Sequence, residues 1–203
     1  DEVHGWGQYL YSYVDTNKYD VRNISASGIT SSDLNKALFG TIEHYGKSGD
    51  ILLLAVGIND YTKAYQTNPT SPDPASYIAN MTDMVQRAKA KGMTVYLVKQ
   101  HGQSNDISKY PLQKSRWFGD AIDGLAETEQ AAVIDLFTPW LELSLENHYF
   151  EMEEYYTADS LHLNADGADK MAKMVSRLLF PPKESGELVE DPYKDFDTAS
   201  TVY

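Results

Sequence analysis

The chain has 203 residues, of which 42% are hydrophobic and 23% charged, values typical of a folded globular domain and not of a disordered segment. Its formal net charge of −13, without any basic patch, excludes nucleic acid as a partner. No run approaches the roughly 18 apolar residues of a membrane helix, and the absence of cysteine excludes disulfides, thiolate metal sites and a cysteine nucleophile.

The first informative segment is a turn of small residues at Ser25–Thr30, centred on Gly28. A helix-start signal follows near Ser31. Residues 51–56 then form a short, continuous apolar run, which predicts a strand covered on both faces. Residues 93–98 and 132–136 predict two more strands of the same kind.

Helical patterns separate and follow these strands. Residues 74–91 carry apolar side chains at helical spacing, and Gly92 stands where a helix commonly ends. Residues 166–180 repeat the pattern before Pro181-Pro182. This alternation predicts an α/β fold, a three-layer sandwich whose parallel central sheet has helices on both faces. Gly57–Asp60 would lie at the carboxyl edge of that sheet, where reactive groups gather.

Both ends of the chain carry an expectation about the protein. We predict one domain over residues 1–182 and an acidic tail over residues 183–203. The chain begins at Asp1 without a methionine or an apolar signal region. We interpret it as the mature form of a secreted or extracellular bacterial protein.

Asp159 precedes His162 by three residues, a spacing that lets one loop present an imidazole together with a carboxylate that orients it. In acyl transfer such a carboxylate fixes the imidazole tautomer and stabilises the imidazolium. The N–H of a small residue such as Gly28 and the amide of Asn59 are both able to point at an oxygen that becomes negative in a tetrahedral intermediate.

These blocks, in this order, resemble the SGNH or GDSL-type hydrolase superfamily, whose fold is flavodoxin-like. Gly5-Trp6-Gly7-Gln8 and the segment from Asp159 to Ala168 are most similar to carbohydrate esterases of the rhamnogalacturonan acetylesterase type. The resemblance implies His162 as general base, Asp159 as its orienting carboxylate, and Gly28 and Asn59 as the oxyanion hole. It implies no metal and no organic cofactor. We expect Trp6 and Asp60 to contact the substrate.

The sequence departs from the family pattern at two points. Ile58 stands where those esterases often have histidine, and the Gly-Asp-Ser block that carries their nucleophile is absent. Three explanations are open. The protein is circularly permuted, with its first strand at the end of the chain and Ser200 as nucleophile; or the serine lies outside this chain; or the protein is an inactive relative that still binds sugar.

The function implied by the resemblance is removal of acetyl groups from a plant cell-wall polysaccharide, either xylan or the rhamnogalacturonan of pectin. The partner would be an acetylated oligo- or polysaccharide, with no nucleic acid and no membrane involved. A net charge of −13 favours neutral xylan over acidic pectin. The alternatives are a non-catalytic carbohydrate-binding relative and another esterase or lipase of the same superfamily.

Overall fold

The computed structural model of the chain describes residues 2–68, 70–71, 73–101, 111–140, 154–158 and 162–180. The chain divides into two compact units. We call one the sheet unit, made of Ala26–Gln100 and Tyr110–Asp135. We call the other the terminal unit, made of Asp1–Ser25, His101–Lys109 and Leu136–Tyr203.

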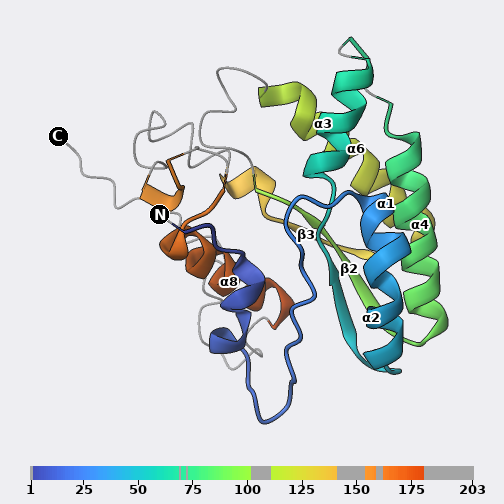
Figure 1. Cartoon of the computed structure of the whole chain (residues 1–203). Helices are drawn as coiled ribbons and strands as arrows, with labels where there is room; N and C mark the ends of the chain where they lie inside the picture. Colours follow the sequence, from blue (N-terminus) through green and yellow to red (C-terminus); the bar gives the residue numbers. More distant parts are fainter. Residues whose placement is uncertain are drawn as a thin grey trace. The chain divides into compact units, whose positions relative to one another are not determined.

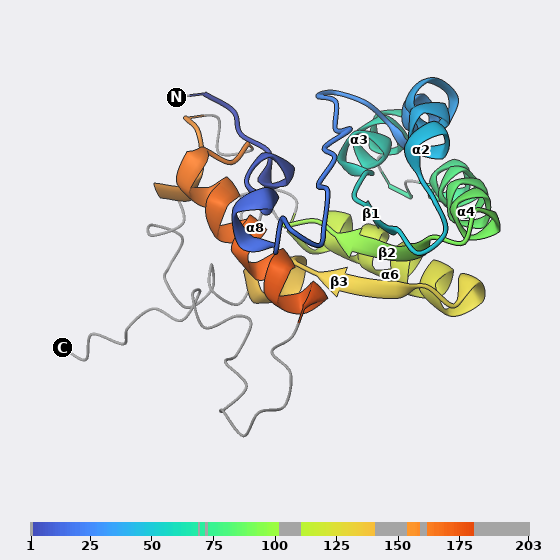
Figure 2. The ribbon, with the colours of Figure 1, turned by 90° about the horizontal axis from the view of Figure 1, so that it is seen from below.

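A parallel sheet in the order β1-β2-β3 organises the sheet unit (Figures 1 and 2). Its strands are β1 (Ile51–Leu54), β2 (Thr94–Lys99) and β3 (Ala132–Asp135). Leu52 pairs with Val95, and Leu97 pairs with Val133. The ends of each strand differ by at most two residues from those of the predicted apolar run. Because the strands also pair in parallel, the predicted α/β class with a parallel sheet is confirmed.

The helices of the sheet unit precede and connect these strands. They are α1 (Ser31–Asp33), which continues through the π-helix η3 (Leu34–Leu38) into α2 (Phe39–Tyr45), and α3 (Ile58–Thr67), α4 (Ala75–Ala90) and α6 (Pro111–Glu129). The helix predicted from apolar spacing over 74–91 is α4. Both α4 and α6 pack against β2 and against each other.

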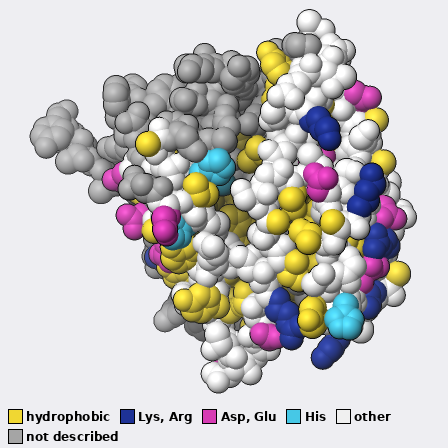
Figure 3. Space-filling model, viewed as in Figure 1, with side chains coloured by type: hydrophobic (Ala, Val, Ile, Leu, Met, Phe, Trp, Pro, Cys, Tyr) yellow, Lys and Arg dark blue, Asp and Glu magenta, His cyan; other side chains and the backbone are white. Residues whose placement is uncertain are grey.

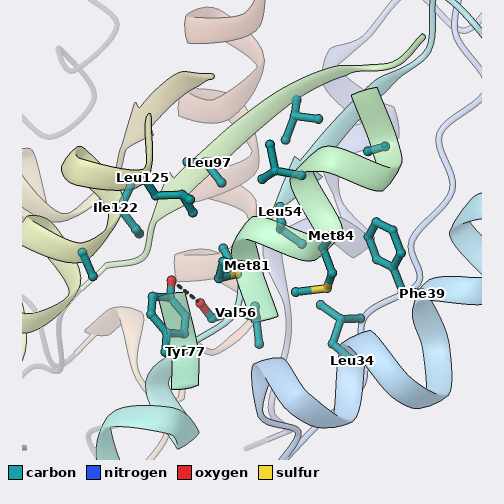
Figure 4. Packing of buried hydrophobic residues seen from close by; sticks show 14 of the residues in the cluster. Leu34, Phe39, Leu54, Val56, Tyr77, Met81, Met84, Leu97, Ile122 and Leu125 are labelled. Carbon is teal, nitrogen blue, oxygen red and sulfur yellow. Dashed lines mark hydrogen bonds between the residues drawn. The ribbon is translucent and has the colours of Figure 1, made fainter. Parts of the chain in front are cut away.

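The core of the sheet unit forms where α4 meets the sheet and the helix that starts at Ser31 (Figure 4). Phe39, Met81, Met84 and Leu97 are fully buried there. Burying each such side chain contributes about 1.5–3 kcal/mol before entropy is subtracted. The Tyr77 hydroxyl, also buried, donates a 3.2 Å hydrogen bond to the carbonyl of Val56. This bond ties α4 to the chain that leaves the carboxyl end of β1.

The terminal unit is organised by α8 (Ala165–Leu179), against which η1 (Trp6–Gln8) and η2 (Leu10–Tyr13) pack (Figure 1). The Tyr13 hydroxyl donates to Asp169 Oδ2 at 2.5 Å, and Ser176 Oγ donates to the Tyr13 carbonyl at 2.6 Å. On the predicted apolar face of α8, four residues are fully buried: Ala168, Met171, Ala172 and Val175. None of the helices in the described ranges is long and apolar enough to cross a membrane.

Candidate active site

The turn at Gly28 combines an unusual backbone conformation with an open surface. Gly28 has φ +74°, and a Cβ added to it would meet nothing within 4 Å. Glycine is therefore favoured here by backbone conformation and not by lack of space. Over the described residues, the exposed Gly28 N–H forms no hydrogen bond. Thr30 then caps α1, in a capping box with Asp33.

Asn59 lies beside this turn. Three residues separate the end of β1 from Ile58, where helix α3 begins, so Asn59 and Asp60 occupy its first turn at the carboxyl edge of the sheet. The Asn59 amide nitrogen donates a 2.9 Å hydrogen bond to the carbonyl of Ile29. An amide group carries two N–H donors, and within the described residues the second forms no hydrogen bond, which leaves it for a ligand. The structure thus brings Gly28 and Asn59 together.

Asp60 points at the start of α1. Its Oδ2 accepts the backbone N–H of Ser31 at 2.8 Å, and its Oδ1 accepts the Ser31 hydroxyl at 2.5 Å. Burial raises the pKa of the Asp60 carboxyl, although both hydrogen bonds from Ser31 act in the opposite direction. The Asp60 carboxylate therefore stabilises the first turns of both α3 and α1. It sits in the first turn of α3, and it caps α1.

In the terminal unit, backbone hydrogen bonds fix the position of His162. The Thr157 N–H donates to the His162 carbonyl at 2.9 Å, and the Asn164 N–H donates to the Tyr155 carbonyl at 3.0 Å. Tyr156 and Leu163 form an antiparallel bridge between these bonds. The loop that carries the half-buried His162 is therefore closed at its base.

The start of α8 supports the same loop. Asn164 caps the helix by accepting the Gly167 N–H at 3.0 Å. Gly167 lies so close to the loop that an added Cβ would stand 2.3 Å from the Tyr155 carbonyl oxygen. The sequence motif from Asp159 to Ala168 contains this glycine, but only the structure gives it this packing role.

Trp6 occupies η1 and is half-buried. Its neighbours shape the turn: the Gly5 N–H donates to Gln8 Oε1 at 3.2 Å, and a Cβ on Gly7 would approach Asn23 Oδ1 to 3.1 Å. The Gly-Trp-Gly-Gln motif therefore has a local structural role, in which Gln8 binds the backbone at the start of η1 and Gly7 lies close to Asn23.

The predicted site residues are distributed as follows. Gly28, Asn59 and Asp60 lie together in the sheet unit, while Trp6 and His162 belong to the terminal unit. Asp159 and Ser200 lie outside the described residues. The sequence did not single out Ser31 as a site residue, because a serine at a helix start resembles an ordinary cap.

Comparison with known proteins gives the chain its relatives. The model of the GDSL-like lipase/acylhydrolase family matches residues 1–170. "Uncharacterized esterase YxiM" of Bacillus subtilis (strain 168) is 34% identical in an alignment of 181 residues that covers 84% of this chain and 44% of that protein.

Solved structures agree with that match. The crystal structure of the B. subtilis YxiM protein has a TM-score of 0.69 at 31% identity, over 84% of this chain and 48% of that one. An acetyl xylan esterase, AlAXEase, shares the fold with a TM-score of 0.65 at 21% identity, over 82% of this chain and 84% of that one. The chain thus spans somewhat less than half the length of the YxiM protein.

Proposed function

Because the chain belongs to the GDSL-like lipase/acylhydrolase family of serine ester hydrolases, we propose that it removes acetyl groups from a plant cell-wall polysaccharide. The main support is the hydrogen bond from Asn59 to Ile29, which holds an amide donor beside the exposed N–H of Gly28. Two such donors suit the oxyanion of an ester-derived tetrahedral intermediate. A net charge of −13 favours neutral xylan over the acidic rhamnogalacturonan of pectin. Such polymers lie outside cells, so we also propose that the protein is secreted.

The proposed chemistry is acyl transfer through a serine. The serine Oγ attacks the acetyl carbonyl carbon while its proton passes to the His162 imidazole, which Asp159 orients. The carbonyl oxygen becomes an oxyanion between the Gly28 N–H and the Asn59 amide. The imidazolium then protonates the departing sugar oxygen, and water hydrolyses the acetyl-enzyme with His162 again acting as base. Trp6 would stack on a sugar ring.

For the nucleophile we propose Ser200, on the hypothesis that the chain is circularly permuted and that residues 183–203 supply the first strand of the family. The support is the run Thr198-Ala199-Ser200-Thr201-Val202, which resembles Gly-Asp-Ser-Thr-Val. A fluorophosphonate probe, which forms a covalent bond with activated serines, tests this assignment by mass spectrometry. We expect the label on Ser200 and its loss in Ser200→Ala, but not in Thr201→Val. A label on another serine, or none, would contradict the assignment.

The esterase proposal is tested by release of acetate from 4-nitrophenyl acetate and from acetylated xylo-oligosaccharides. We expect His162→Ala to reduce kcat/KM by at least about 10³-fold, since removing a triad member removes most of the catalysis. His44→Ala is the matched control, because His44 is exposed on α2 and belongs to no proposed site. A chain that binds the oligosaccharide without releasing acetate would instead be the carbohydrate-binding relative.

A further inference from the structure

A partly buried polar network joins Asp60, Ser31 and Asn80 next to the residues of the proposed oxyanion hole. Ser31 is completely buried, and its hydroxyl donates to Asp60 Oδ1. Asn80, on α4, donates from its amide nitrogen to the same hydroxyl oxygen at 3.2 Å. The Ser31 hydroxyl thus has a donor on one side and an acceptor on the other, which fixes the direction of its proton. A buried polar side chain with all its partners in place holds its surroundings in one arrangement.

Asp60, which follows Asn59 in α3, binds the same stretch of chain that Asn59 binds. Asn59 binds the carbonyl of Ile29, and its neighbour Asp60 binds the N–H and the hydroxyl of Ser31. Two consecutive residues of α3 therefore bind two alternate residues of the chain that leads into α1. One hydrogen bond alone leaves a hinge, whereas three bonds at two points fix both the separation and the orientation of the joined segments.

We infer that Asp60 is a positioning residue, which acts through Ser31 and Asn80 to hold the Gly28 N–H at a fixed place relative to the Asn59 amide. This inference rests on the proposed function, because the two donors matter as a pair only if they bind one oxyanion. Both carboxylate oxygens of Asp60 are engaged by Ser31, so the carboxylate acts on the protein itself rather than on a substrate. A displacement of one donor by about 1 Å is enough to cost about 10²-fold in rate.

The test combines a structural readout with a kinetic one on the full chain. In Asp60→Ala and Ser31→Ala we expect NMR to show a lower order parameter for the Gly28 amide and shifted signals of the Asn59 side-chain NH₂. The amide of Leu97 in β2 is the internal reference, and its order parameter should stay unchanged. In the same variants kcat for 4-nitrophenyl acetate should fall by about 10–10²-fold, with KM changed less than about twofold.

Two further variants separate positioning from general damage. Asp60→Asn retains one acceptor oxygen, so its kcat should lie between those of the wild type and Asp60→Ala. Asp20→Asn removes the same charge from an exposed ion pair with Arg22 and should change neither readout. Ser31→Ala is a small change and keeps the test open if Asp60→Ala does not fold.

The outcomes for the positioning role and for the proposed function are distinct. If the wild type releases no acetate, the esterase proposal fails, while the NMR readout still decides whether Asp60 fixes the turn. An unchanged Gly28 order parameter together with unchanged Asn59 signals in Ser31→Ala would overturn the positioning role. So would a rise in KM with unchanged kcat in the folded Asp60 variants.

Discussion

Gly28 shows how a single backbone angle contributes to a site. A side chain there would have space, but its φ of +74° disfavours every residue with a Cβ. The angle directs the chain from the exposed turn into the capped start of α1, leaving the Gly28 N–H without a protein acceptor in the described part of the chain. The glycine is thus required for the geometry that makes the N–H available.

This requirement predicts opposite effects for two identical substitutions. Gly28→Ala should lower the free energy of unfolding by about 1–2 kcal/mol, because alanine is strained at this φ. Gly40→Ala should raise it by up to about 1 kcal/mol, because Gly40 lies within α2 and also has open space around it. Urea unfolding of both variants measures the difference. Equal changes in the two variants would show that backbone conformation is not the reason for Gly28.

At the scale of elements, charged side chains tie α4 to the helix that starts at Ser31. Arg87 donates from Nε to Glu43 Oε1 at 3.0 Å, from a second nitrogen to Glu43 Oε2, and from Nη1 to Asn35 Oδ1 at 2.7 Å. Its guanidinium also lies 4.9 Å from the centre of the Phe39 ring. Figure 3 shows acidic and basic side chains interspersed over α2 and α4. These contacts hold the helices in place around the core of the sheet unit.

The Arg87 contacts predict a pH dependence of stability. The hydrogen bond from Arg87 lowers the pKa of Glu43, so the pair stabilises the folded state above the ordinary glutamate range near 4.5, and this contribution disappears as the pH falls through the lowered pKa. At pH 7 Glu43→Gln should cost about 1 kcal/mol, since the pair is partly exposed. Thermal unfolding from pH 7 to pH 3 should show the two proteins converging in acid. A difference that persists or grows in acid would contradict this sign.

The start of α8 carries the second element-scale prediction. Gly167→Ala should destabilise the protein by about 1–3 kcal/mol, because the new methyl group would collide with the Tyr155 carbonyl oxygen and not with a flexible side chain. The loop of His162 is paired to the same segment, so its NMR signals should shift as well. Ala165→Gly, at an exposed position of the same helix turn, is a control that should leave the loop unchanged. A stable Gly167→Ala protein with unshifted His162 signals would contradict the close packing.

The elements also show what the sequence was able to predict. The strands, α4 and α8 follow from apolar runs and helical spacing, because burial on one or two faces dictates those patterns. Helix α3 was missed, since it buries only Tyr61 and most of its other residues are polar. Helix α6 was not predicted either, because Gly119 and Gly124 lower the helix propensity of its sequence. The bonds from Asp60 to Ser31 join residues 29 positions apart, and such contacts depend on tertiary packing that no local pattern contains.

At the scale of the whole molecule, net charge and an exposed strand have opposing effects on association. In the described part of the chain β1 pairs on one side only, and Ile51 is 39% exposed. An apolar strand edge of this kind favours pairing with another chain. The net charge of −13 opposes it, because two copies repel each other at low salt.

Raising the salt concentration should therefore promote association. The screening length falls from about 10 Å at 0.1 M to about 3 Å at 1 M, which weakens the repulsion but not apolar contact. Sedimentation velocity should detect oligomers at 1 M NaCl that are absent at 0.1 M. Ile51→Lys should suppress them, whereas Tyr45→Lys, at an exposed aromatic position on α2, should not. If both variants form oligomers to the same extent, the chains associate through a surface other than the edge of β1.

The bonds among Ile29, Ser31, Asn59, Asp60 and Asn80 have a consequence for biosynthesis. All five residues are translated at least about eighty positions before His162. The nascent polypeptide therefore contains both partners of each of these hydrogen bonds before the imidazole is made. Evolution is likewise free to lose or replace the late segment without disturbing the early one, and a relative that binds esters without cleaving them would be one product of that freedom.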